Sequence, residues 1–253
     1  MSAGPQEPEM VVVADEAAVA EAAGERFAAA VVKAVDRRGV ARVVLTGGDT
    51  PRRAYAGLAR EPFRSRVPWE RVHLFWGDER CVPPTHPRSN FGMARRSLLA
   101  HIDIPPENLH RMHGEWEPGR AAEAYTEEIR RSFGGEPPRW DLVHLGLGGD
   151  AHIASLFPFS DVLRERRRWV STSLLEERGE WRVTLTVPAL RAAEHIHFVV
   201  AGAGKASAVH SVLQGALDPH RFPGQSIRDA PTRTAWIVDR AAAGKLEHRP
   251  DHP

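Results

Sequence analysis

The sequence predicts an α/β fold, a Rossmann-like three-layer architecture with a largely parallel sheet and helices on both faces. Short β-branched runs alternate with helical stretches, and glycine clusters follow several of these runs. With 253 residues, 42% hydrophobic and 26% charged, the chain can bury a sizeable core, and we expect residues 1–253 to form one domain. Ligands of such sheets bind at the carboxyl ends of the strands, so the glycine loops predict the edge of a site.

The first predicted unit is helix, strand, glycine loop and helix. Residues 15–38 are rich in alanine, acidic early and basic late, and precede Gly39, which is typical of a helix and its end. Residues 41–46 form a β-branched run that Gly47 and Gly48 break. Thr50 and Pro51 then favour helix initiation.

The same order recurs along the chain. Residues 71–76 predict a strand, residues 77–89 a polar loop and residues 90–100 a helix. Other predicted helices cover residues 119–132 and 203–214. Other predicted strands cover residues 140–146, 195–201 and 234–238.

Composition excludes several classes of protein. Lys and Arg number 34 against 33 Asp and Glu, so no charge excess favours nucleic acid or an acidic membrane surface. No apolar run approaches the ~20 residues of a spanning helix, and residues 1–10 do not resemble a signal peptide. The single cysteine, Cys81, excludes an internal disulfide and fits a cytoplasmic protein.

Two glycine loops are candidate anion sites. Gly47 and Gly48 precede a helix, where backbone N–H groups and Thr50 can hold a phosphate. The alternative is a tight turn with Asp49 or Thr50 as a helix cap, and the Asp49 carboxylate repels an anion unless it points away. Gly202 to Lys205 likewise follow a strand, with Lys205 adding an ammonium group, or serve only for packing.

The segment Trp76 to Arg80 places two carboxylates and a guanidinium at a strand end. Arg80 can grip a phosphate with its planar fork, or pair locally with a carboxylate and order the loop. Cys81 beside it has no neighbouring base and is interpreted as structural.

His152 is the candidate general base. It lies in the loop that follows the strand of residues 140–146, imidazole titrates near neutrality, and Asp150 can orient it. Gly146, Gly148 and Ala151 also match a degenerate dinucleotide motif, but Pro158 truncates the helix that this motif requires. The 13 histidines include no H-E-x-x-H pattern, so no metal site is expected.

These motifs together resemble the 6-phosphogluconolactonase family, within the group that includes glucosamine-6-phosphate deaminases. The resemblance spans most of the chain. Its landmarks are LTGGDTP (45–51), FWGDERCVP (75–83) with Ser89-Asn90, LGLGGDAHIASLFP (145–158), RVTLTVPAL (182–190), AGAGKA (201–206) and PGQSIR (223–228). Ser155 to Pro158 resemble the lactonase S-L-F-P and lack the glutamate of the deaminases' F-N-E-P.

The resemblance implies cofactor-free hydrolysis of 6-phospho-D-glucono-1,5-lactone to 6-phosphogluconate, in the pentose phosphate pathway. It implies His152 and Asp150 as the catalytic pair, and a sugar phosphate lactone as the partner of a monomer or small homo-oligomer. The residues expected to bind the substrate and its phosphate are Gly47, Gly48, Thr50, Arg80, Asn90 and Lys205.

Two departures from the family pattern stand in these loops. Asp49 occupies a position where serine is common, and Ala151 occupies the glycine position of D-G-H, which predicts strain if that residue has positive φ. The alternatives are a glucosamine-6-phosphate deaminase, a non-catalytic sugar-phosphate binding protein and a nucleotide-binding oxidoreductase.

Overall fold

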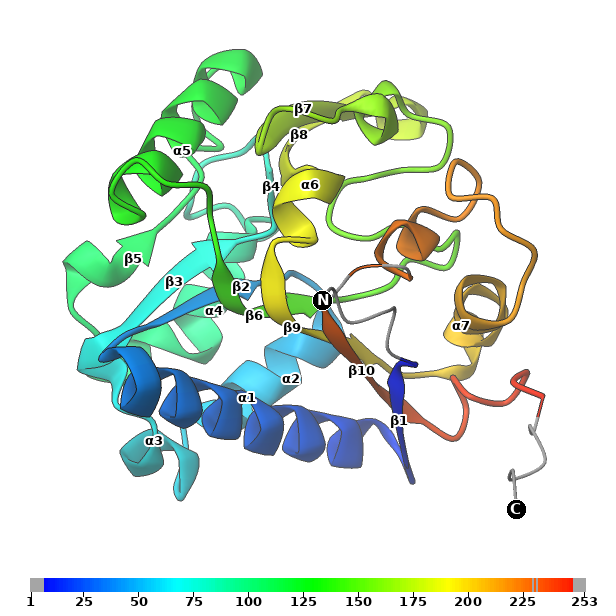
Figure 1. Cartoon of the computed structure of the whole chain (residues 1–253), viewed down its shortest axis with the longest axis horizontal. Helices are drawn as coiled ribbons and strands as arrows, with labels where there is room; N and C mark the ends of the chain where they lie inside the picture. The colour runs from blue at the N-terminus through cyan, green and yellow to red at the C-terminus, as the bar shows by residue number, and fades with distance from the viewer. Residues whose placement is uncertain (1–6, 229, 231, 248–253) are drawn as a thin grey trace, which may run out of the picture.

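The computed structural model describes residues 7–228, 230 and 232–247, so most of the N-terminal segment examined for a signal peptide lies outside it. A parallel seven-stranded sheet forms its centre, in the order β1-β10-β9-β6-β2-β3-β5 (Figure 1). Its strands are β1 (Glu9–Val13), β2 (Ala41–Leu45), β3 (Val72–Trp76), β5 (Leu109–His110), β6 (Trp140–Leu145), β9 (Ala193–Val200) and β10 (Arg233–Asp239). The predicted α/β class and parallel sheet are confirmed.

Each face of this sheet is buried against a different layer. Val43, Leu74 and Leu142 share one hydrophobic cluster with helix residues such as Phe27 and Tyr55. Because side chains alternate along a strand, their chain neighbours face the opposite cluster. The helices are α1 (Glu16–Arg38), α2 (Asp49–Leu58), α3 (Phe63–Arg66), α4 (Asn90–Ser97), α5 (Pro118–Ser132), α6 (Val187–Leu190) and α7 (Ala206–Leu213).

Local signals explain where the first helix begins and ends. The Asp15 carboxylate accepts a hydrogen bond from the Ala18 amide at 2.9 Å and caps α1. Gly39 ends the helix in the left-handed conformation, with φ 73°, and its amide bonds to the Val35 carbonyl. The predicted first helix is therefore confirmed at both ends.

A second, antiparallel sheet is absent from the sequence prediction. It consists of β4 (Asp78–Arg80), β8 (Glu180–Leu185) and β7 (Val170–Leu175), and it lies beside α5 and α6 (Figure 1). The expected polar loop 77–89 thus begins with a strand. Gly77 joins the two sheets, since its amide donates to the Leu45 carbonyl and its carbonyl accepts from the Leu185 amide, both at 2.8 Å.

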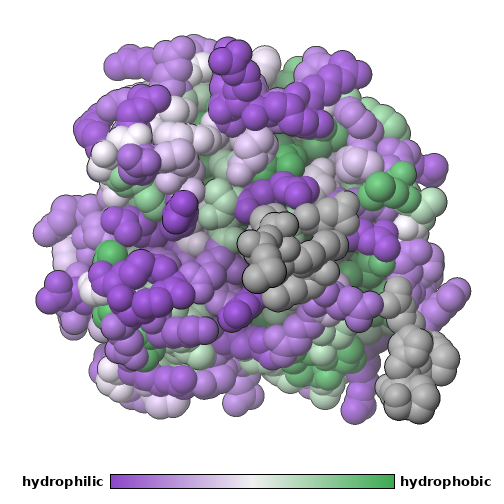
Figure 2. Space-filling model, in the orientation of Figure 1, coloured by the Kyte–Doolittle hydropathy of each residue, from purple (hydrophilic) through white to green (hydrophobic). Residues whose placement is uncertain are grey.

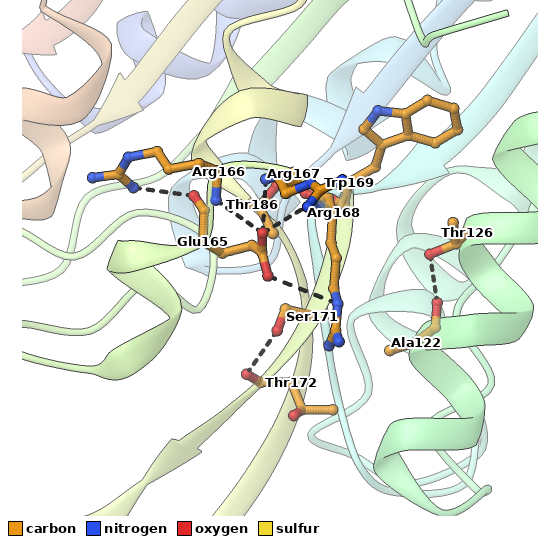
Figure 3. A network of polar contacts seen from close by, with 10 residues as sticks. All are labelled: Ala122, Thr126, Glu165, Arg166, Arg167, Arg168, Trp169, Ser171, Thr172 and Thr186. Carbon is orange, nitrogen blue, oxygen red and sulfur yellow. Dashed lines mark hydrogen bonds and ion pairs between the residues drawn. The ribbon is translucent and has the colours of Figure 1, made fainter.

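The start of β7 is held by a polar network (Figure 3). The Glu165 carboxylate accepts hydrogen bonds from the backbone amides of Arg167 and Arg168, at 2.7 and 3.0 Å. The Thr186 hydroxyl donates to the Arg168 carbonyl at 2.6 Å, which ties the end of β8 to the segment entering β7. The network thus orders the segment entering β7 and holds it to the end of β8.

Three other elements differ from the prediction. Strand β1 was not predicted at all, although it pairs with β10. The helix expected at 90–100 ends at Ser97 and continues as a 3-10 turn, Leu99–His101. The helix expected at 203–214 begins with a 3-10 turn, Ala203–Lys205, before α7.

The face in Figure 2 is mainly hydrophilic, with apolar patches between the polar side chains. Within residues 7–247, leaving aside those not described, no helix is long and apolar enough to span a bilayer.

Candidate active site

A cavity of about 330 Å³ lies where the parallel strands end. Loops that follow β2, β3, β6 and β9 meet there, as expected for the carboxyl edge of a parallel sheet. It brings together nearly all the predicted site residues, namely Gly47, Gly48, Thr50, Arg80, Asn90, His152 and Lys205. Asp150 is not part of the wall but contacts it through His152.

His152 and Asp150 form a hydrogen-bonded pair. The His152 Nδ1 atom is 2.6 Å from Asp150 Oδ1, and the His152 amide donates to the same oxygen at 3.2 Å. The imidazole also packs edge-on against the Phe157 ring, with centroids 5.0 Å apart. Since Asp150 occupies Nδ1, Nε2 is the ring nitrogen left for a ligand or water in the cavity that His152 lines.

The electrostatics of this pair favour a charged carboxylate. Burial raises the pKa of Asp150, but the hydrogen bond and charge of His152 outweigh it, so the pKa lies below its ordinary value. An ionised Asp150 accepts from Nδ1–H, which selects the tautomer with an unprotonated Nε2. That tautomer is the one that can take a proton from water.

Ala151, between these two residues, has the left-handed conformation, with φ 66°. The strain expected from alanine at this position is therefore present, at roughly 1–2 kcal/mol for a residue with a Cβ atom. Its carbonyl accepts a hydrogen bond from the Gly224 amide at 2.9 Å, which holds it in place. The segment of the PGQSIR motif, residues 223–228, thus supports the loop that carries His152.

Gly148 leaves room for the His152–Asp150 pair. A Cβ atom there would lie 2.1 Å from His152 Nδ1 and 2.3 Å from Asp150 Oδ1. We expect Gly148→Ala to displace the imidazole and lower kcat about 10²-fold, the cost typical of a misplacement near 1 Å. Steady-state kinetics on the folded variant measures this.

The neighbouring glycine provides a matched control for that substitution. A Cβ atom at Gly149 would find its nearest neighbour, the Gly204 carbonyl, at 3.9 Å. Gly149→Ala should therefore keep wild-type kcat. Equal kcat in the two alanine variants would show that the pair does not need the space at Gly148.

The loop after β2 exposes the start of α2. Gly48 is the cap residue, with φ 112°, and no side chain caps the helix, so the proposed caps Asp49 and Thr50 are wrong. The Asp49 side chain is 86% exposed and lies 3.4 Å from Arg52 Nε, while the Thr50 hydroxyl is 3.5 Å from Glu16. Backbone N–H groups of the first turn are thus free of side-chain caps.

Arg80 lines the same cavity. Its Nη1 atom donates to the Arg88 carbonyl at 2.6 Å, and its buried Nε has no hydrogen-bond partner among the described residues. No Asp or Glu of the described chain forms an ion pair with it, so the local pairing that the sequence left open is wrong. The guanidinium therefore retains donors for an anion.

Glu79, the second carboxylate at this strand end, does not line the cavity, unlike Asp78 and Arg80. It accepts the amides of Asn90 and Phe91, at 2.7 and 2.8 Å, and the Ser89 hydroxyl at 2.9 Å, at the start of α4. Burial raises the pKa of Glu79, and these hydrogen bonds oppose the rise. Its role is to anchor α4, which carries Asn90.

Asn90 reaches the cavity wall with its amide already engaged. Its Nδ2 atom donates to the Asp78 carbonyl at 2.9 Å and to Asp78 Oδ1 at 3.1 Å. Its Oδ1 atom lies against Gly47, where a Cβ atom would be only 2.0 Å away. Asn90 thus packs against the glycine loop and supports it.

Lys205 lies at the end of a 3-10 turn and not in an α-helix, which corrects the predicted helix opening. Burial lowers the pKa of its amine, and the nearby Asp150 carboxylate opposes this shift. The Gly202 amide donates to both oxygens of Asp239 at 3.0 Å, which fixes the turn. Lys205 lines the cavity, and its amine is close enough to Asp150 for that carboxylate's charge to act on it.

The small sheet adds residues that the sequence analysis missed. Leu175, Arg178 and Arg182 line the cavity from the β7–β8 hairpin. Arg182 is buried and pairs with Glu180 at 2.8 Å, and burial together with the charge of Arg80 lowers its pKa. The RVTLTVPAL landmark was the only signal for this hairpin, and it assigned no role.

Three comparisons place the chain among known proteins. Residues 14–236 match the family described as glucosamine-6-phosphate isomerases/6-phosphogluconolactonase. The 6-phosphogluconolactonase of Mycobacterium tuberculosis is 39% identical over 237 residues, 89% of this chain and 93% of that protein. The Synechocystis 6-phosphogluconolactonase is 37% identical over 220 residues, 85% of this chain and 89% of that protein.

Solved structures share the architecture. The 6-phosphogluconolactonase of Trypanosoma brucei superposes with a TM-score of 0.84 at 26% identity, covering 95% of this chain and 99% of that one. A monomeric glucosamine-6-phosphate deaminase reaches 0.80 at 18% identity, covering 94% and 100%, and shares the fold alone.

Proposed function

Because the chain belongs to the glucosamine-6-phosphate isomerase/6-phosphogluconolactonase family, we propose that it hydrolyses 6-phospho-D-glucono-1,5-lactone to 6-phosphogluconate. Relatives at 37–39% identity over more than four fifths of the chain are 6-phosphogluconolactonases, so the enzyme is a lactone hydrolase. The observation that carries the substrate assignment is one cavity that holds both a His–Asp pair and cationic groups.

In this mechanism His152 is the general base. Its Nε2 atom takes a proton from water as the water oxygen attacks C1 of the lactone. The tetrahedral intermediate then collapses, the bond from C1 to the ring oxygen breaks, and His152 returns the proton to that oxygen. Asp150 holds the imidazole and stabilises its cationic form. Positioned acid–base catalysis of this kind contributes about 10²–10⁴-fold.

The phosphate group anchors the substrate in this proposal. Arg80, Lys205 and the backbone N–H groups from Gly47 to Thr50 supply positive charge and donors, and Asn90 holds the glycine loop in place. Binding energy from the remote phosphate orients C1 toward His152 and so contributes to the reaction rate.

Rapid-mixing turnover tests the proposal directly. Freshly generated 6-phosphogluconolactone should open far faster with enzyme than in a no-enzyme control, which accounts for spontaneous hydrolysis. Turnover no faster than that control would favour a non-catalytic sugar-phosphate binding protein. Release of ammonia from glucosamine 6-phosphate would instead identify a deaminase.

Asp49 should weaken phosphate binding slightly. Its carboxylate lines the cavity but is largely exposed, so water and salt screen its repulsion of an anion. We expect Asp49→Asn to lower KM for the phosphorylated lactone about twofold, an effect that shrinks at high salt. Asp36→Asn in α1, which changes net charge equally outside the cavity, should leave KM unchanged.

The oligomeric state and a cytoplasmic location remain predictions. A relative in Arabidopsis thaliana, 33% identical over 219 residues, is named chloroplastic.

A further inference from the structure

A buried chain of hydrogen bonds connects the His152 loop with the small sheet. Asp78 Oδ2 accepts from the Ser155 hydroxyl at 2.7 Å, and Asp78 Oδ1 accepts from Asn90 Nδ2 at 3.1 Å. Ser155 is 1% exposed and Asp78 6% exposed. Ser155 follows His152 by three residues in the loop after β6, while Asp78 begins β4, so the contact joins this loop to the small sheet.

A second hydrogen bond holds Ser155 to the same sheet. Its amide donates to the Thr184 hydroxyl at 3.2 Å, and Thr184 is the β8 partner of Asp78. Between His152 and Ser155, Ala154 has a left-handed backbone, with φ 48°, and Ile153 bridges to Leu156. The turn that carries His152 is thus tight and is attached at Ser155.

The hydrogen-bond partners of the buried Asp78 carboxylate indicate a role beyond packing. A buried carboxylate is costly unless it is compensated; Arg182 is close enough for its charge to act on Asp78, but no Lys, Arg or His of the described residues forms a direct ion pair with it. Its two oxygens instead accept from the loop of His152 and from Asn90, which buttresses Gly47. Hydrogen bonds to a charged acceptor are the stronger ones.

We propose that Ser155 and Asp78 are positioning residues, which together hold the loop of His152 in register with the anion-binding loop at Gly47. The inference rests on the proposed lactone hydrolysis with His152 as the base. Neither side chain takes a proton in the reaction. Their contribution is to keep Nε2 of His152 at the distance from C1 that the bound phosphate defines.

Ser155→Ala tests this most cleanly, because it removes one hydroxyl and little volume. We expect kcat to fall about tenfold while KM for 6-phosphogluconolactone stays within about twofold, since the phosphate-binding groups are untouched. The imidazole NMR resonances of His152 should also shift. Asp78→Asn should lower kcat similarly, and the double variant should lose less than the product of the two single effects.

Ser173→Ala is the matched control. Ser173 is a buried serine of β7 in the same small sheet, but its hydroxyl has no partner among the described residues. The kcat and the His152 resonances of Ser173→Ala should match those of the wild type. All variants are compared well below their melting temperatures, with circular dichroism confirming the folded state.

Wild-type kcat and unshifted His152 resonances in Ser155→Ala would overturn the inference, as would fully multiplicative effects in the double variant. If Asp78→Asn does not fold, Ser155→Ala decides alone. An inactive wild-type enzyme would refute the proposed function itself. Activity in wild type, Ser173→Ala and Ser155→Ala alike would refute only the positioning role.

Discussion

Replacing His152 with asparagine should lower kcat for 6-phosphogluconolactone about 10³-fold, within the range of a positioned general base. Asparagine keeps a polar side chain of similar reach and can still meet Asp150, so the loop should retain its shape. It cannot accept a proton from water near neutral pH. The loss should therefore appear in kcat, with KM little changed, because phosphate binding relies on other residues.

Rapid mixing is needed for this variant, since spontaneous hydrolysis sets a floor under slow enzymes. The matched control is His101→Asn, an exposed histidine that does not line the cavity. It should keep wild-type kinetics. A folded His152→Asn enzyme with near-normal turnover would remove the imidazole from the mechanism.

The central sheet was predictable because its strands are short and almost wholly buried. In β6 every residue is buried, and in β2 and β3 only one of five is not. Strands covered on both faces appear as continuous apolar runs, and here glycines mark where several of them end. Such local signals identify a strand without knowledge of the strands that pair with it.

The small sheet lacked such signals. Strand β4 has three residues, all of them charged, and β7 reads VSTSLL, with a polar run from Ser171 to Ser173. Each of these strands is defined by its partner, as in the pairing of Asp78 with Thr184. The pairing of β4 with β8 joins segments roughly a hundred residues apart, which local periodicity does not show, whereas β7 and β8 form a hairpin whose mixed polar sequence hides it.

The candidate site shows the same contrast between features that local sequence predicts and features that depend on distant contacts. The positions of His152, Arg80 and Lys205 at the ends of strands were sufficient to predict that they meet. The directions of neighbouring side chains were not predictable. Glu79 turned inward to the start of α4, and Arg182 reached the cavity from a hairpin that was not predicted.

Replacing Arg80 with alanine should abolish much of the preference for a phosphorylated substrate. Its guanidinium has a buried, unpartnered Nε and no carboxylate partner among the described residues, so its charge remains available to a ligand. Hydrogen bonds to charged groups contribute about 1.5–3 kcal/mol each, so kcat/KM for 6-phosphogluconolactone should fall roughly 10- to 10²-fold. The value of kcat/KM for unphosphorylated gluconolactone should change little, because that substrate has no phosphate for Arg80 to bind.

The ratio of the two substrates separates this effect from general damage. A misplaced β4 would slow both reactions equally, since Asp78 of that strand also contacts the His152 loop through Ser155. Arg95→Ala, at an exposed arginine of α4 outside the cavity, should leave both kcat/KM values and their ratio intact. If the folded Arg80→Ala enzyme kept the wild-type ratio, the phosphate would have to be held by Lys205, the hairpin arginines and the α2 loop without Arg80.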